Sequence, residues 1–256
     1  MLQAERLDII KKYIDDIGYV DITSLVNVLG MSKSTVRRDL KRLQEGNAIE
    51  ITWGGAISTI NSGSLREDSY KVKVENNRDE KRRMAEFACK MLTDRQSVFL
   101  DSGTTIKEMV PIINRKPLEL LVATNDIAIA CGLNETDNIV VTVIGGTLRK
   151  GYYTLTGVFS ETILREICLD TAFMSCDSID LINGFSLTNM EEVPIKRMIM
   201  SAASKTVMLC DHSKFNKKSF MQLFDITPSV EIITGKELDD ETYNRYIEKN
   251  LNIIRV

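Results

Sequence analysis

The residues best suited to binding a small ligand form the run Asp101-Ser102-Gly103-Thr104-Thr105, between a short apolar segment and a helical pattern. A glycine flanked by hydroxyl side chains at a strand-to-helix turn exposes successive backbone N–H groups and the positive end of the helix. Such a turn can bind a phosphate group. The alternative is a well-capped helix, with Ser102 or Thr104 as its N-cap.

Polar residues also follow the next two predicted strands, with Thr124 and Asn125 after the first and Gly145, Gly146 and Arg149 after the second. Ligands of open α/β sheets bind outside the carboxyl ends of the strands, so we expect these three strand ends to meet at one crevice. Asn125 taken alone is more typical of a helix cap.

Charged side chains near two later elements are further candidates. Glu192 and Lys196 lie four residues apart on a predicted helix and share one face, either as a surface ion pair or as groups that face a ligand. Asp211 and Lys214 follow the predicted strand 206–210, where Lys214 could neutralise a phosphate and Asp211 could accept from a sugar hydroxyl. The one histidine, His212, excludes a multi-histidine metal site, and we expect no metal and no cofactor.

A different kind of site is predicted near the N-terminus. The spacing of apolar residues predicts helices over 4–17, 22–29 and 32–44, with Ser32 as the N-cap of the third. An alternating segment at 48–55 predicts a short hairpin or wing. This order is that of a winged helix-turn-helix, which places its last helix in the DNA major groove.

The third helix carries the side chains that such a contact requires. Residues 31–46 hold five basic and two acidic side chains, although the whole chain has a net charge of −3. A charge run alone is more typical of a solvated helix face, but the helix-turn-helix context favours DNA. The predicted DNA-binding residues are Ser32, Lys33, Ser34, Thr35, Arg37, Arg38, Lys41 and Trp53. Trp53 either contacts DNA from the wing or packs against the three helices.

The remainder of the chain alternates helical patterns with short apolar strands. Strands are predicted at 97–100, 120–123, 139–144, 171–175, 206–210, 231–234 and 252–256, with helices at 79–92, 105–113, 126–133, 158–168, 192–204 and 239–249. Such alternation predicts a mostly parallel sheet covered by helices, an α/β fold. The expected domains are 1–57, a polar linker at 58–77, and 78–256.

Composition agrees with a folded chain and excludes several other classes. The 256 residues are 43% apolar and 27% charged, without an apolar run long enough to span a membrane. The charged N-terminus does not resemble a signal peptide, so we expect a cytoplasmic protein. Five cysteines without a C-x-x-C pair suggest neither a disulfide framework nor a zinc ribbon.

The sequence resembles the DeoR family of bacterial transcriptional regulators over nearly its whole length. In the first part the resemblance rests on Arg6, the segment SKSTVRRDL at 32–40, Arg42-Leu43 and the Gly-Gly-Ala of 54–56. In the second part it rests on DSGTT at 101–105, Thr124-Asn125, Ile144 to Gly146 with Arg149, Gly157, Asp170 with Ala172-Phe173, Glu192 with Lys196, and Asp211 to Phe215. The wing departs from the family pattern, since Ile51, Thr52 and Trp53 stand where an arginine and a histidine are common, and Met174 to Asp177 replaces a glycine-containing stretch.

The resemblance implies a winged helix-turn-helix followed by a sugar-phosphate sensor domain with the fold of ribose-5-phosphate isomerase and glucosamine-6-phosphate deaminase. The implied function is that of a non-enzymatic repressor of a sugar-catabolic operon, a homodimer or homotetramer that binds operator DNA under the control of a phosphorylated sugar. Residues 102–105 would hold the phosphate, Lys196 and Lys214 would balance its charge, and Asp101, Asn125 and Glu192 would bind sugar hydroxyls. Two alternatives remain: a sugar-phosphate isomerase or deaminase with Asp101 or Glu192 as base, and a DNA-binding protein with a vestigial crevice.

Overall fold

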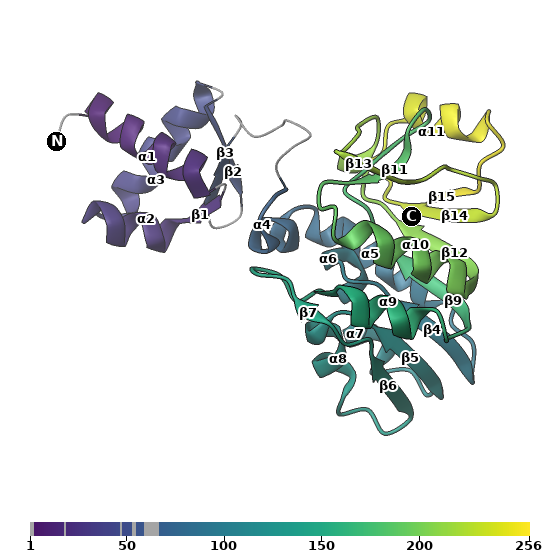
Figure 1. Ribbon diagram of the computed structural model, residues 1–256. Coiled ribbons are helices and arrows are strands. Elements are labelled where there is room, and N and C mark those ends of the chain that lie inside the picture. The colour runs from purple at the N-terminus through teal and green to yellow at the C-terminus, as the bar shows by residue number, and fades with distance from the viewer. Residues whose placement is uncertain (1–2, 18, 47, 53–54, 59–66) are drawn as a thin grey trace. The chain divides into compact units, whose positions relative to one another are not determined.

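The computed structural model describes residues 3–17, 19–46, 48–52, 55–58 and 67–256. It divides into two compact units, Met1–Asn76 and Asn77–Val256 (Figure 1). Within the described residues, the helices are too short or too polar to cross a membrane.

The first unit is a winged helix-turn-helix. Its helices are α1 (Gln3–Ile17), α2 (Ile22–Leu29) and α3 (Lys33–Glu45), and its antiparallel sheet has the order β1 (Tyr19–Asp21), β3 (Gly55–Ser58), β2 (Ile49–Thr52). Asp21 caps α2 by accepting from the Ser24 N–H at 2.9 Å, and Gly30 ends it in the left-handed conformation at φ 63°. The predicted helices and hairpin are confirmed, and β1 was missed because three residues carry no periodic signal.

A short helix, α4 (Tyr70–Glu75), lies within the segment predicted to be a linker. Its Val72 is 2% exposed, and Lys73 Nζ lies 2.5 Å from Glu67 Oε1. With one fully buried apolar residue in two turns, the helix has too little periodicity to be recognised from sequence.

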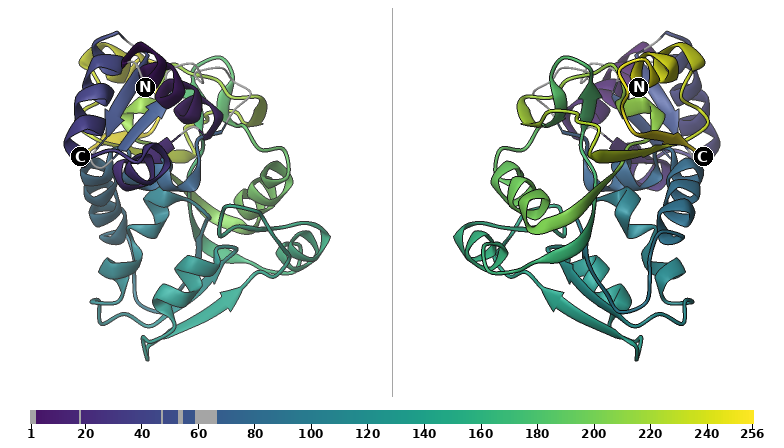
Figure 2. Two further views of the ribbon diagram at one scale, coloured as in Figure 1. Left: turned by 90° about the vertical axis from the view of Figure 1, so that its left-hand side faces the viewer. Right: turned by 90° about the vertical axis from the view of Figure 1, so that its right-hand side faces the viewer.

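The second unit is built on a seven-stranded parallel sheet with helices on both faces (Figures 1 and 2). The strand order is β15 (Ile253–Arg255), β14 (Val230–Thr234), β12 (Ala203–Leu209), β9 (Leu169–Met174), β4 (Gln96–Leu100), β5 (Leu120–Thr124), β6 (Ile139–Val143). The helices are α5 (Arg78–Cys89), α6 (Thr104–Lys107), α7 (Val110–Ile113), α8 (Ile127–Leu133), α9 (Val158–Leu164), α10 (Glu192–Ala202) and α11 (Asp240–Ile247).

The alternation of side chains along the central strands divides the core into two layers. Val98 and Leu100 of β4 pack in one buried cluster with residues of α5 to α8, whereas Phe99 packs in a second cluster with residues of α9 to α11. The strands therefore contribute apolar side chains to both faces, as expected of a parallel sheet buried on both sides. The predicted α/β class is confirmed.

Two small antiparallel elements were not predicted. β7 (Thr147–Leu148) pairs with β8 (Leu155–Thr156), and β11 (Gly184–Leu187) lies between β10 (Ser178–Asp180) and β13 (Met221–Phe224). Gly184 has φ 69°, and a Cβ there would lie 2.3 Å from the Phe224 carbonyl oxygen, so this crossing requires glycine. Strands of two to four residues are too short for a clear alternating pattern.

Five predicted helices differ from the observed ones by two residues or more. Those predicted to end at 92 and 249 end at Cys89 and Ile247. The helix predicted over 105–113 is two short helices, because Pro111, in the first turn of α7, has no N–H group with which to continue the preceding helix. The helices predicted to end at 168 and 204 end at Leu164 and Ala202, and in the second case the chain passes directly into β12.

Candidate functional sites

The exposed face of α3 contains most of the predicted DNA-binding side chains. Ser34, Arg37, Arg38 and Lys41 are exposed. Ser34 and Lys41 each lie three or four residues from the adjacent Arg37 and Arg38, so the four side chains form one continuous exposed surface of the helix. Ser32 and Lys33 are also exposed, Thr35 is half-buried, and Trp53 lies outside the described residues. Ser32 caps the helix, as predicted, by accepting from the Thr35 N–H at 3.3 Å. This geometry suits a helix that inserts its N-terminal half and basic flank into a groove.

A buried ion pair increases the positive character of that face. Asp39, which is fully buried, accepts from Arg6 Nε at 2.6 Å and Arg6 Nη2 at 3.1 Å. Asp39 is the one acidic residue between Lys33 and Arg42. Its carboxylate is buried in a two-fold hydrogen bond with the Arg6 guanidinium, so it does not add negative charge to the exposed face. Arg6 entered the sequence analysis only through the family resemblance, because a contact between residues 33 positions apart leaves no mark on local spacing.

In the second unit, a buried ion pair lies at the carboxyl end of the central strands. Lys196 of α10 is 3% exposed and donates to Asp101 Oδ2, to the Ser175 carbonyl at 3.1 Å and to the Ser102 carbonyl at 3.5 Å. The Ser175 N–H also donates to Asp101 Oδ2, at 3.1 Å. The ends of β4 and β9 are thus connected to α10 through one ammonium group.

Burial and pairing act in opposite directions on the charges of this pair. Burial raises the pKa of Asp101, while Lys196 and the Ser175 and Ser102 N–H groups oppose that rise. Burial by itself lowers the pKa of Lys196, but the carboxylates of Asp101 and Glu192 raise it overall, so Lys196 stays protonated.

Two buried oxygen atoms at this site have no hydrogen-bond partner among the described residues, Asp101 Oδ1 and Thr105 Oγ1. Buried polar atoms normally have partners. Asp101 Oδ1 could accept a hydrogen bond from a ligand hydroxyl, and the Thr105 hydroxyl could donate one to a phosphate oxygen. Gly103 is the N-cap of α6, and a Cβ there would lie 3.3 Å from Ser175 Cβ. The helix cap that was the alternative for Ser102 or Thr104 is therefore not observed.

Ser102 and Asn125 are bonded to the protein itself. Ser102 Oγ donates to Asp126 Oδ2 at 3.2 Å and also contacts Thr154 Oγ1, while its N–H donates to Asn125 Oδ1 at 3.3 Å. Asn125 Nδ2 donates to the Leu155 carbonyl at 3.2 Å. The N-cap of α8 is Asp126, so the interpretation of Asn125 as a helix cap is wrong. These side chains hold the β4 and β5 ends against the β7–β8 hairpin.

Thr124 and the two glycines are also engaged in the fold. Thr124 Oγ1 donates to the Leu100 carbonyl at 2.6 Å, tying β5 to β4. A Cβ on Gly146 would lie 2.5 Å from the Thr156 carbonyl oxygen, so glycine is needed there for the close approach of the chain. The Gly145 carbonyl accepts from Ser160 Oγ at 2.5 Å. All three residues therefore make contacts within the protein near these strand ends.

Glu192 and Lys196 share a face of α10 but do not pair with each other as a surface ion pair. Glu192 Oε1 accepts from Arg149 Nη1 at 2.6 Å, and both side chains are close to nine-tenths buried. The Arg149 guanidinium carbon lies 3.8 Å from the centroid of the Tyr152 ring, a cation–π contact. The pair connects the β7–β8 hairpin to α10 beside the Asp101–Lys196 pair.

Lys214 and Asp211 complete the edge of the site. Lys214 Nζ donates to Ser175 Oγ at 2.9 Å and lies 4.0 Å from Asp211 Oδ2. Burial alone would raise the pKa of Asp211, but Lys214, the Ser213 hydrogen bond, Lys81 and the Asn77 amide lower it overall. Asp211 is therefore ionised, and Lys214 supplies a cation to the Ser175 hydroxyl.

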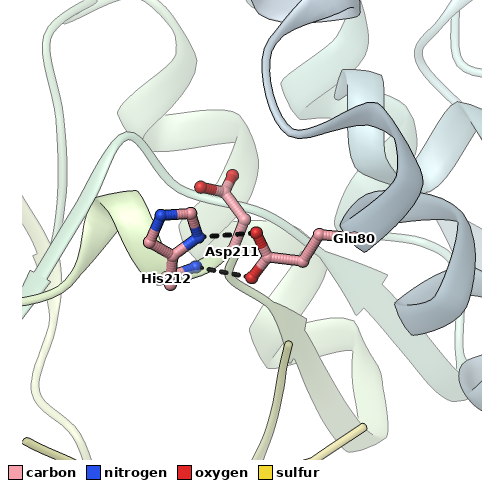
Figure 3. A group of neighbouring side chains, drawn as sticks. All are labelled: Glu80, Asp211 and His212. Atoms are coloured by element: carbon pink, nitrogen blue, oxygen red, sulfur yellow. Dashed lines mark hydrogen bonds and ion pairs between the residues drawn. The ribbon is translucent and has the colours of Figure 1, made fainter. Parts of the chain in front are cut away.

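Glu80, Asp211 and His212 form a side-chain group that the sequence analysis did not anticipate (Figure 3). Glu80 of α5 accepts from the His212 N–H at 2.8 Å, and its second oxygen lies 2.7 Å from His212 Nδ1. One ligand atom from each of the three residues lies within 4.8 Å of the others, the spacing of a metal site. Both Glu80 oxygens and Asp211 Oδ1 already make hydrogen bonds within the protein, so hydrogen bonding accounts for the group.

Comparison with known proteins finds a matching family model for each of the two units. The DeoR-like helix-turn-helix domain matches residues 6–61, and the DeoR C terminal sensor domain matches residues 76–236. The chain belongs to the DeoR family. It is therefore a transcriptional regulator with a helix-turn-helix unit and a sensor unit, and every candidate ligand-binding residue described above lies within the DeoR sensor domain.

Relatives in the DeoR family match along nearly the full chain. The HTH-type transcriptional regulator GlpR of Haloferax volcanii is 34% identical over 242 residues, which cover 94% of this chain and 93% of the relative. The HTH-type transcriptional regulator IolR of Bacillus subtilis is 29% identical, covering 97% of each chain. Among solved structures, ribose 5-phosphate isomerase A from Methanocaldococcus jannaschii aligns with 55% of each chain, at 16% identity and a TM-score of 0.41.

Proposed function

We propose that the chain acts in the cytoplasm as an operator-binding repressor of a sugar-catabolic operon, and that a phosphorylated sugar bound in the second unit controls its DNA affinity. The observation that carries this proposal is the pair of buried, unpartnered oxygens of Asp101 and Thr105 among the described residues of the DeoR sensor domain. Buried polar atoms without a partner in the protein are suited to a hydroxyl-rich ligand.

In the proposed complex the residues have different roles. The hydroxyl groups of Thr104 and Thr105 and the backbone at Gly103 hold the phosphate, and Lys214 balances its charge. Asp101 Oδ1 accepts from a sugar hydroxyl. The contacts of Ser102, Asn125, Lys196 and the Arg149–Glu192 pair with the protein support a positioning role for these residues.

We propose sensing rather than turnover. Both carboxylates that could act as a base are held by cations, Asp101 by Lys196 and Glu192 by Arg149. A general base must lie within about 3 Å of the proton that it takes, and an ion pair with a cation makes a carboxylate a weaker base. Conversion of ribose 5-phosphate or a hexosamine 6-phosphate by the wild-type protein, lost in Glu192→Gln, would establish the isomerase or deaminase alternative.

The proposed regulator acts as a homodimer or homotetramer. Helix-turn-helix proteins bind two-fold operators whose half-sites lie about one helical turn apart, which requires two copies of α3.

The direct test measures binding to DNA from the promoter of the chain's own operon by fluorescence anisotropy, at fixed salt, with and without a panel of sugar phosphates. We expect specific binding that one sugar phosphate changes about 5- to 150-fold, which corresponds to a coupling of about 1–3 kcal/mol. Binding that no member of the panel alters, together with no thermal stabilisation by any member, would favour the vestigial crevice.

Substituting Thr104 and Thr105 with valine should abolish the response to the sugar phosphate and leave operator binding intact. Because Thr105 Oγ1 is buried without a partner among the described residues, valine at this position should leave the unfolding free energy unchanged or slightly higher. Thermal shift and anisotropy together measure both effects. Thr162→Val, which removes an exposed hydroxyl on α9, serves as the control. Simultaneous loss of DNA binding in the double variant would indicate misfolding and contradict the assignment.

A further inference from the structure

The residue at which the chain enters the second unit is fixed by side-chain hydrogen bonds to a distant loop. Asn77 is the first residue of that unit and precedes α5, with φ 54°, which is uncommon outside glycine. Its side chain makes no helix-cap bond and instead donates to Asp211 Oδ1 at 2.8 Å and to Ser213 Oγ at 3.2 Å. The first residue of the sensor unit is thus held by side chains 134 and 136 positions away.

The first turn of α5 adds two more hydrogen bonds to the same loop. Glu80, which is 3% exposed, accepts from the backbone N–H and lies against the imidazole Nδ1 of His212 (Figure 3). A Cβ on Gly235 would lie 2.4 Å from Glu80 Oε1, so the carboxylate is also confined from the side of β14. The start of α5 and the loop 211–214 are therefore held together as one body.

The other end of this loop lies at the proposed ligand site. Residues 212–214 form a single 3₁₀ turn, closed by the Lys214 N–H donating to the Asp211 carbonyl at 3.1 Å, so Lys214 and Asp211 are held together. Lys214 Nζ donates to Ser175 Oγ, and Ser175 contacts both members of the Asp101–Lys196 pair. A continuous series of polar contacts thus leads from the buried ion pair to Asn77.

We propose that the 211–214 loop transmits occupancy of the ligand site to the junction at Asn77, and that this is how the effector changes operator affinity. This inference rests on the proposed function and deepens it. A phosphate close to Ser175 competes with the serine hydroxyl for the Lys214 ammonium group. A shift of Lys214 moves the 3₁₀ turn, and with it the acceptors that hold Asn77 and the donors that hold Glu80.

The junction is the place where such a movement has the largest consequence, because the chain passes there from the helix-turn-helix unit into the sensor unit. A ligand changes an equilibrium only by its different affinity for two states. Here the two states are defined by whether Lys214 contacts Ser175 or the ligand.

The first test separates ligand binding from its transmission. In Asn77→Gly, glycine keeps the positive φ and removes the amide, so the backbone conformation is retained. Operator affinity is measured by anisotropy, and ligand binding by thermal shift, using ribose 5-phosphate, fructose 1-phosphate, glycerol 3-phosphate and inorganic phosphate. The control is Glu237→Gln, which breaks the Arg83–Glu237 pair, another tether of α5 that does not involve the loop.

We expect a probe to raise the melting temperature of the wild type, Asn77→Gly and Glu237→Gln alike, but to change operator affinity at least about 5-fold only in the wild type and Glu237→Gln. A wild-type response in Asn77→Gly would overturn the inference, as would loss of the thermal shift in that variant. If none of the probes stabilises the wild type, the proposed function fails, and the second test then decides only whether the loop communicates with the junction.

The second test requires no ligand. Lys214→Met removes the contact with Ser175, and Lys217→Met removes a neighbouring exposed lysine as the control. The Lys81 N–H donates to the Asn77 carbonyl at 2.9 Å, so its hydrogen exchange reports on the first turn of α5. We expect exchange at Lys81 to be at least about 5-fold faster in Lys214→Met and unchanged in Lys217→Met. Equal exchange rates in the two variants would show that the loop does not communicate with the junction.

Discussion

Replacing Arg37 and Arg38 together with alanine should weaken binding to promoter DNA by about 30-fold or more. Both side chains are exposed on the same face of α3, which is packed against the core through Val36, Leu40 and Leu43. A contact to a base edge is worth about 1–3 kcal/mol, so removing two arginines that each make one weakens binding by at least that factor. For each arginine that contacts phosphate, the dependence of affinity on salt should fall by about one unit of slope.

A charge-matched variant distinguishes this contact from a general effect of net charge. Lys217 and Lys218 are exposed on a loop of the sensor unit, and Lys217→Ala with Lys218→Ala removes the same two charges. We expect that variant to bind DNA with nearly wild-type affinity. Unchanged affinity in the arginine variant would show that α3 is not the recognition helix.

The elements that the sequence predicts well are those whose stability comes from repeated burial. The stripe of Val36, Leu40 and Leu43 predicts α3 within one residue, and the apolar runs of β4 and β14 are predicted nearly as closely. Elements of two to four residues, such as β7 and β10, owe their structure to neighbours that are distant in the sequence. Their residues carry too few alternations for a periodic signal.

Side-chain partners at the site were harder to anticipate than the site's location. Spacing places Glu192 and Lys196 on one face of α10, but it does not show that Arg149 and Asp101 approach from separate strand ends. Local spacing does not mark Glu80 as a site residue, because its partner His212 is 132 positions away in the sequence. Asn125 was expected to cap a helix if it did not bind a ligand, but the cap of α8 is Asp126, and the Asn125 amide hydrogen-bonds to two other strand ends. Tertiary contacts decide which polar residues remain available to a ligand.

The largest effect on stability should come from Lys196→Met. Lys196 is 3% exposed and Asp101 is fully buried, so the substitution leaves a carboxylate in the core without its cation. Breaking a buried pair in this way costs about 3–5 kcal/mol. The free energy of unfolding of the sensor unit can be followed through hydrogen exchange of the β4 and β9 amides, which lie at the centre of the sheet. Arg82→Met, which breaks the exposed pair with Glu86 on α5, should cost less than about 1 kcal/mol.

Two further measurements would identify the buried charge as the cause of the stability lost in Lys196→Met. Burial already raises the pKa of Asp101, and removing Lys196 raises it further, so the folded state of the variant binds a proton more tightly than the unfolded state. Lys196→Met should therefore regain stability as the pH falls through the pKa of Asp101 in the folded state. The loss of unfolding free energy relative to the wild type should be smaller at about pH 5 than at about pH 8. Asp101→Asn in the Lys196→Met background should also restore part of the stability, because no charge then remains buried. A deficit that neither acid nor the second substitution reduces would assign the loss to packing of the lysine stem and not to electrostatics.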